Sequence, residues 1–217
     1  MTREIFNKEL REVKDKLFQV TGDVRRNLKL SVRYLEKRDM TGAKMIVESD
    51  EIINLKVLEI EDLCLSIIAT QQPVASDLRL LFSILQISTE IERIGDYAKG
   101  IARISLKIGS ESLIRPLIDI PGMEQLAGQM LSDAITAFTE DNAVAAESIS
   151  RRDARIDAMY NQVHRELLTF VMEKRSNINQ TIMLDWVAHN LERVGDRVTN
   201  ICERIIFTVT GNSVDLN

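Results

Sequence analysis

The sequence predicts an all-α protein built from two tandem, pseudo-symmetric, antiparallel three-helix bundles. Three observations support this fold class. The 217 residues are 45% hydrophobic but only 5% aromatic, with three prolines, which is typical of packed helices and not of a β-sandwich. Apolar residues recur at spacings of three and four over long stretches, as on the buried face of a helix. Finally, one short motif occurs twice, one hundred residues apart.

Three long helices are expected in the first half of the chain. They run from about Arg3 to Arg38, from about Met40 to Thr70, and from Pro73 to about Ile108. Pro73 follows two glutamines and suits the first turn of a helix, where its missing N–H is not needed. The buried seam of the third helix is predicted to contain Leu80, Ile84, Ile87, Ile91, Ile94, Ala98 and Ile101.

Three more helices are expected after a linker at residues 109–122, which contains Gly109, Pro116 and Pro121. They cover residues 123–140, residues 143–173, and the stretch from the loop at 176–179 to about Gly211. The seam of the last helix is predicted to contain Val187, Leu191, Val194, Val198, Ile201 and Ile205. Because the connections are short, successive helices should be antiparallel neighbours.

An internal repeat relates the two halves. Residues 92–96, Glu-Arg-Ile-Gly-Asp, recur at 192–196 as Glu-Arg-Val-Gly-Asp. Residues 50–54 similarly align with residues 153–157. We therefore interpret residues 1–110 and 111–217 as two copies of one three-helix unit.

Charge and composition exclude several classes of protein. A net charge of −5 gives no basic footprint for nucleic acid, so no nucleic-acid partner is expected. The charged N-terminus has no apolar segment typical of a secretion signal, and no apolar run is long enough for a membrane span. We therefore expect a cytoplasmic protein without membrane insertion. Cys64 and Cys202 fit no metal or redox spacing and are predicted to be small core residues.

The repeated motif places two carboxylates one helical turn apart. Glu92 and Asp96, like Glu192 and Asp196, would repel each other unless a cation lies between them. With 100° of rotation per residue, these acids point away from the apolar seams of their helices. They therefore differ from the inward-facing ligands of a ferritin-like site.

The preceding helix of each unit adds further acids. Asp50 and Asp153 occupy seam positions, where a carboxylate needs a partner. An antiparallel hairpin places Asp50 beside the first motif, and Asp153 with Asp157 beside the second. The predicted metal ligands are thus Asp50, Glu92 and Asp96 in one cluster and Asp153, Asp157, Glu192 and Asp196 in the other. Such oxygen-rich clusters suit hard cations.

Two alternatives to metal binding remain open for these acids. They could simply be solvated, or Arg93 and Arg193 could neutralise them. His189 lies on the stripe of Glu192 and is a further candidate ligand, although Thr89 replaces it in the first copy. Gly95 and Gly195 disfavour a helix relative to alanine, so we expect a neighbouring helix to approach closely at both; the alternative is a chance repeat of tolerated glycines.

The chain resembles the PhoU family of phosphate-signalling regulators. The resemblance is carried by residues 71–79, Gln-Gln-Pro-Val-Ala-Ser-Asp-Leu-Arg, with residues 91–96, and by residues 191–196 in the second copy. It covers nearly the whole chain. It implies two tandem three-helix bundles with metal ions at E/D-x-x-x-D motifs, here Glu92 with Asp96, Asp153 with Asp157, and Glu192 with Asp196. The fourth motif departs from this pattern, because Asn54 follows Asp50 in place of a second acid.

The resemblance also implies a function. Members of the family are negative regulators of phosphate-responsive signalling and of phosphate uptake. They are thought to link the ATPase subunit of the phosphate ABC transporter to a membrane sensor histidine kinase. The resemblance thus implies a non-catalytic, often homodimeric protein, cytoplasmic or peripheral to the inner face of the membrane. The implied cofactors are divalent or trivalent metal ions, which could be iron, manganese, magnesium or zinc.

Two other functions are compatible with the residues. The first is a metal-storage bundle, or a purely structural bundle without ions. The second is a carboxylate-bridged metalloenzyme, but such a site would use inward Glu-x-x-His motifs, and this chain has two histidines in all. Neither a phosphate-binding loop of the G-x-x-x-x-G-K type nor a G-x-S-x-G motif occurs. We therefore expect no enzymatic activity.

Overall fold

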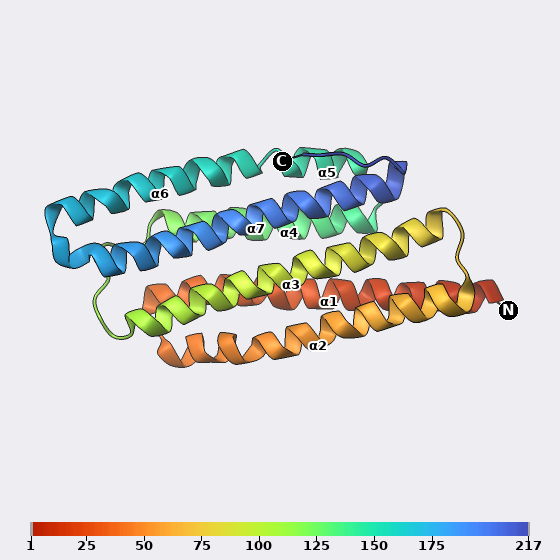
Figure 1. Cartoon of the computed structure of the whole chain (residues 1–217), viewed down its shortest axis with the longest axis horizontal. Helices are drawn as coiled ribbons and strands as arrows, with labels where there is room; N and C mark the ends of the chain where they lie inside the picture. The colour runs from red at the N-terminus through yellow and green to blue at the C-terminus, as the bar shows by residue number, and fades with distance from the viewer. Residues whose placement is uncertain (1, 217) are drawn as a thin grey trace.

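A computed structural model describes residues 2–216, which form helices and no strand (Figure 1). The helices are α1 (Thr2–Lys37), α2 (Met40–Gln71), α3 (Ser76–Ile108), α4 (Asp119–Thr139), α5 (Ala143–Ser150), α6 (Asp153–Glu173), the 3₁₀ helix η1 (Arg175–Asn177) and α7 (Ile178–Thr210). The predicted all-α fold class is therefore confirmed.

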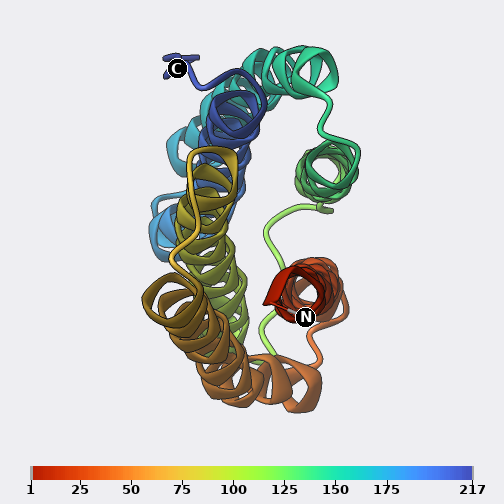
Figure 2. The same cartoon turned by 90° about the vertical axis from the view of Figure 1, so that its right-hand side faces the viewer.

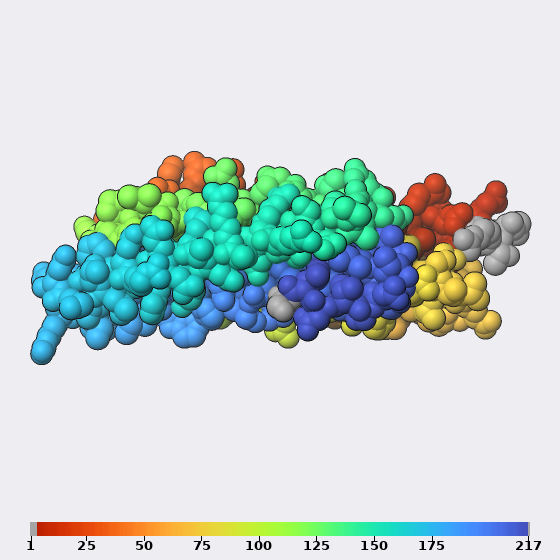
Figure 3. Space-filling model, turned by 90° about the horizontal axis from the view of Figure 1, so that it is seen from above, coloured from red at the N-terminus to blue at the C-terminus, as the bar shows by residue number. Residues whose placement is uncertain are grey.

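The helices form two three-helix bundles that pack side by side. Helices α1, α2 and α3 contact one another, and α4 and α7 pack with the α5–α6 segment in the same way. The bundles meet where α3 lies along α7 and α1 lies beside α4 (Figure 2). Helix α6 runs along an outer face of the molecule (Figure 3). The predicted pair of bundles is confirmed, whereas the boundary between residues 110 and 111 stays a prediction.

Local signals begin two of the helices. The Asp39 carboxylate accepts a hydrogen bond from the Gly42 N–H at 2.9 Å, and the Asn142 amide oxygen accepts one from the Ala145 N–H at 2.9 Å. Both are N-cap contacts that satisfy donors left free at a helix start. The α1–α2 turn is completed by Arg38, whose φ of 56° ends the preceding helix.

The starts of α3 and α4 differ from the prediction. Pro73 was expected in the first turn of a helix, but α3 begins at Ser76. The reason is that Gln72 and Ala75 have φ values of 47° and 42°, which no helix can include. In contrast, α4 begins at Asp119 and contains Pro121, which was placed in the linker. A proline is compatible with the first helical turn because the N–H groups there have no partner within the helix.

The helix expected at residues 143–173 is interrupted, and the predicted continuous helix is wrong at this point. Arg151 and Arg152 separate α5 from α6. The Arg152 N–H bonds to the Ile149 carbonyl at 3.0 Å, which tightens the turn, and its guanidinium reaches Asp133 on α4 at 2.5 Å. The last helix also starts earlier than expected, since Ile178 lies in α7 and not in a loop.

The predicted seams form the core. All the predicted seam residues of α3 and α7 are buried except Leu80, which is partly buried. Cys64 and Cys202 are unpaired and buried, as predicted, and burial raises the pKa of each thiol to about 12. No helix within residues 2–216 has the length and apolar character needed to cross a membrane.

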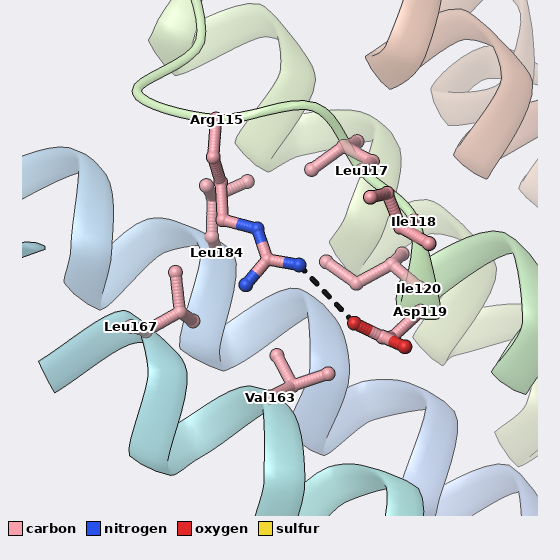
Figure 4. A pocket seen from close by; sticks show the side chains of 8 residues that line it. All are labelled: Arg115, Leu117, Ile118, Asp119, Ile120, Val163, Leu167 and Leu184. Atoms are coloured by element: carbon pink, nitrogen blue, oxygen red, sulfur yellow. Dashed lines mark hydrogen bonds and ion pairs between the residues drawn. The ribbon is translucent and has the colours of Figure 1, made fainter. Parts of the chain in front are cut away.

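The linker between the bundles is fixed by Arg115. Its guanidinium contacts Asp119 at 3.1 Å (Figure 4). It also forms an ion pair with Glu166 of α6. The Arg115 side chain is surrounded by apolar side chains, among them Leu117 and Val163, which leave a cavity of about 10 Å³. That space holds about one water molecule, so the pocket is a packing feature and not a ligand site.

Candidate functional site

The first acidic cluster lies between α2 and α3. It consists of Asp50 and Asn54 on α2 with Glu92, Asp96 and Lys99 on α3. Asp50 is only 3% exposed, and the Lys99 ammonium donates a hydrogen bond to its Oδ2. Because a buried carboxylate is stable only when paired, Lys99 is what permits Asp50 at a seam position.

The remaining acids of the first cluster have weaker partners. The Arg93 guanidinium lies 3.7 Å from Glu92 and 3.6 Å from Asp96. Burial raises the pKa of Glu92, and the carboxylates of Asp96 and Asp50 raise it further, so the three acids lie close together. Two buried oxygens, Oδ1 of Asp50 and Oδ1 of Asn54, have no hydrogen-bond partner.

The second acidic cluster lies between α6 and α7. Asp153 and Asp157 extend from α6, and Glu192 and Asp196 from α7. Burial raises the pKa of Asp153 to about 7, and the charges of Asp157, Asp196 and Glu192 contribute to the rise. The pKa values of Asp157 and Glu192 are also raised, first by burial and then by Asp196. The four predicted ligands are therefore neighbours, as the hairpin argument expected.

Close helix packing is found at only one of the two motif glycines. A methyl group on Gly195 would clash with Oδ1 of Asp153 and would lie 3.0 Å from Ile156 Cδ1. At Gly95 the nearest atom to such a methyl group is Ile53 Cγ2 at 3.5 Å, an ordinary contact. The predicted close approach is confirmed at Gly195 and wrong at Gly95, because Asp50 points to Lys99 instead.

Cationic and aromatic side chains border the second cluster. Arg193 forms an ion pair with Asp196. The pKa of its guanidinium is raised, mainly by a hydrogen bond with the side chain of Tyr97 on α3. His189 Nδ1 lies 3.3 Å from Glu192 Oε2. The His189 ring also packs against Tyr160 and Trp186. His189 thus lies where a ligand of this cluster would be.

The acids are less exposed than an outward direction suggests. The side chains of Glu92 and Asp96 are 25% and 39% exposed, and those of Glu192 and Asp196 are 20% and 24% exposed. They point away from the centre of each bundle, but the adjacent helix covers them. The reading of these acids as fully solvated side chains therefore does not apply.

The second cluster fits a metal ion better than the first. Within residues 2–216, no three carboxylate, imidazole or thiol groups converge closely enough to hold one as they stand, so binding requires side chains to rotate. Asp153 Oδ1 is buried against Gly195 without a hydrogen-bond partner, and the nearest partner of Glu192 Oε2 is the His189 imidazole at 3.3 Å. These are hard oxygen donors suited to Mg²⁺, Mn²⁺ or iron. In the first cluster, Lys99 already provides a positive charge.

Sequence reasoning missed two features. Lys99 lies three residues after Asp96, so its helical spacing placed it on the stripe of the acids. The second feature is a groove of about 680 Å³ between α1 and α4, lined by Arg25, Arg26 and Lys29 together with Glu124. The basic side chains of the groove lie on one face of α1. The opposite wall is formed by α4, and it lies there only because the two bundles pack together.

Comparisons with known proteins agree on one family. The family model "PhoU domain" matches residues 18–105 and again residues 120–205. The chain is 36% identical to a phosphate-specific transport system accessory protein PhoU homolog of Clostridium acetobutylicum, with 100% of both chains covered. It is 34% identical to the accessory protein PhoU of Escherichia coli K12, over 95% of this chain and 86% of that protein.

Two crystal structures are similar throughout. PhoU from Pseudomonas aeruginosa superimposes with a TM-score of 0.90 at 33% identity, over 95% of this chain and 100% of that one. The phosphate transport system regulatory protein PhoU from Streptococcus pneumoniae gives a TM-score of 0.89 at 30% identity, over 97% and 99%.

Proposed function

The chain belongs to the PhoU family, and from this premise we propose that it is a non-catalytic regulator of phosphate homeostasis. It restrains phosphate uptake and represses phosphate-responsive genes when phosphate is plentiful. The observation that carries the proposal is the match of the family model to both halves of the chain. The printed names of the relatives, which describe an accessory protein of phosphate-specific transport, support it.

We further propose two macromolecular partners. One is the ATPase subunit of the phosphate ABC transporter, and the other is a membrane sensor histidine kinase. The protein then acts in the cytoplasm, at the inner face of the membrane, as the link between them. A homodimer is also proposed. The outward side of α2 supports association, because Met45, Ile52, Leu55, Leu58 and Leu65 are each more than half exposed there.

A gene deletion tests the regulatory function. In the host, deletion should make phosphate-starvation genes constitutive in high phosphate, and a plasmid copy should restore repression. A phosphatase reporter measures the effect. Normal repression in the deletion strain would show the proposal to be wrong. Affinity capture with the ATPase subunit and with the kinase tests the two partners separately.

Metal-ion binding is also proposed for the acidic residues, where an ion would fix the packing of neighbouring helices. The second cluster gives the stronger support, through the crowding of Asp153, Asp157, Glu192 and Asp196. A cation there would relieve repulsion among the four carboxylates. Elemental analysis of untagged protein, compared with a Glu92→Ala/Glu192→Ala variant, tests this. Equal metal content in the two proteins would remove the ion proposal and leave the regulatory one intact.

A further inference from the structure

The two acidic clusters are built from matching positions but differ at two of them. Asn54 in the first cluster matches Asp157 in the second, and Lys99 matches Thr199. As a result, three carboxylates in the first cluster face the two cations Lys99 and Arg93. In the second cluster, four carboxylates face one arginine, Arg193, and the His189 imidazole lies beside Glu192.

Lys99 is positioned at the centre of the first cluster. Its ammonium bonds to Asp50 Oδ2, and its charge acts to lower the pKa of Glu92, so one cation acts on acids from both helices. Asp50 is only 3% exposed, and its other carboxylate oxygen, Oδ1, has no hydrogen-bond partner. The side chain of Lys99 is itself only 21% exposed, so neighbouring residues cover most of it.

Thr199 offers no such charge. It is 1% exposed, and its hydroxyl has no hydrogen-bond partner. Asp153, which matches Asp50, has a partnerless oxygen beside Gly195. At the position of α7 that matches Lys99, the second cluster therefore has no cationic side chain.

We propose that the Lys99 ammonium takes the place of a metal ion in the first cluster, so that this chain binds a divalent cation only at Asp153, Asp157, Glu192 and Asp196. The inference rests on the ion binding proposed above for the second cluster. A divalent ion entering the first cluster would meet the ammonium as a like charge. It would also have to displace Lys99 from Asp50, and Asn54 would contribute an uncharged ligand in place of a carboxylate.

Neutralising pairs of acids tests which cluster binds. Protein is treated with chelator, loaded with Mn²⁺, dialysed and analysed for bound metal. Glu92→Gln/Asp96→Asn should leave the Mn²⁺ content unchanged, whereas Glu192→Gln/Asp196→Asn should abolish it. Both double variants keep the Lys99–Asp50 pair, and circular dichroism checks that each is folded.

Exchanging the matched residues tests the role of Lys99 directly. Thr199→Lys should abolish Mn²⁺ binding, and Lys99→Thr should create a second binding site per chain. Lys107→Thr is the control, because Lys107 is an exposed lysine on the same helix with no part in the cluster. It should behave like wild type. Circular dichroism checks that each variant is folded. If Lys99→Thr does not fold, Lys99→Gln is used in its place.

The outcomes separate the two proposals. Loss of Mn²⁺ in Glu92→Gln/Asp96→Asn, or unchanged binding in Thr199→Lys, would overturn the role given to Lys99 while ion binding stands. If no protein in the series binds Mn²⁺, the ion binding itself is wrong, and the Lys99 inference is overturned with it.

Discussion

Gly195 and Gly95 occupy the same place in the two repeats, yet only Gly195 is needed for packing. At Gly195 the Asp153 carboxylate lies against the backbone of α7. At Gly95 the neighbouring Ile53 leaves room for a methyl group. The same residue in the same motif thus has two different roles, which a matched pair of substitutions can distinguish.

Gly195→Ala should lower the free energy of unfolding by about 1–3 kcal/mol, because the added methyl group forces Asp153 and Ile156 to move. Gly95→Ala should leave stability unchanged or raise it by about 1 kcal/mol, since alanine favours the helix. Urea denaturation of both variants measures the difference. Equal effects would mean that the contact between Asp153 and Gly195 is not a constraint.

The stability of the ion-free protein should fall as pH rises from about 4 to about 7. The reason is that the pKa of Asp153 is about 7 in the folded chain and 3.8 ordinarily. Below pH 3.8 the group is protonated in both states. Between these values it ionises in the unfolded chain first, which favours unfolding, and above about 7 the loss is complete.

Asp153→Asn should remove this part of the pH dependence. Thermal unfolding in EDTA across the pH range measures it. Asp62→Asn, at an exposed position of α2, is the control, because it changes the net charge equally. An Asp153→Asn curve parallel to wild type would contradict the prediction.

The carboxylates of the candidate site could be predicted from sequence because they recur at fixed spacings in a repeat. Their proximity followed from the antiparallel hairpin. The role of Lys99 could not be predicted from the sequence, since a lysine on an acidic stripe is usually a solvated partner. Only burial of Asp50 in the folded chain makes Lys99 its necessary counter-charge.

At the scale of helices, periodicity predicted where the buried faces lie but not every helix end. The apolar positions Ile149 and Ile156 keep a helical spacing across the break at residues 151–152, so the pattern could not reveal it. The break depends on Arg152 reaching Asp133 on another helix. Likewise, Ala75 near the start of α3 has a φ of 42°, a value that an alanine side chain does not favour and that the sequence therefore could not reveal.

Helices α2 and α6 should differ in stability. Nine residues of α2 are buried, whereas α6 buries Ile156, Val163 and Leu167. In ion-free protein, backbone amides of α6 should therefore exchange hydrogen faster than those of α2. Mn²⁺ should slow exchange in α6 and leave α2 unchanged.

Hydrogen-exchange mass spectrometry measures both helices in one experiment. Asp153→Asn should remove the effect of Mn²⁺ on α6. Equal protection of α2 and α6 by the ion would contradict the assignment of the site to the second cluster.

At the scale of the whole molecule, the repeat predicted two bundles but not how they meet. The contacts between α3 and α7 include polar pairs such as Arg197 with Glu90 at 3.3 Å and Arg204 with Gln86 at 3.0 Å. Such residues resemble a solvated helix face in sequence, so their burial between bundles is visible only in the folded chain. The domain boundary after residue 110 stays a prediction.

Arg197→Ala should destabilise the protein by about 1–3 kcal/mol, because it leaves the partly buried Glu90 without its partner. Arg151→Ala is the matched control. Its ion pair with Glu147 is exposed, so its removal should cost less than about 1 kcal/mol. Urea denaturation measures both. A larger loss for Arg151→Ala would mean that the pair between the bundles contributes little.

The interruption before Asp153 has a mechanical consequence. Helix α6 is separated from α5 by the turn at residues 151–152 and from α7 by a short 3₁₀ turn at 175–177, so a tilt of α6 would not require another helix to bend. Helix α2 is continuous from Met40 to Gln71. A tilt of α6 would carry Asp153 and Asp157 away from α7 while α5 keeps its place. A tilt of α6 would therefore also increase the distance between the carboxylates of α6 and those of α7.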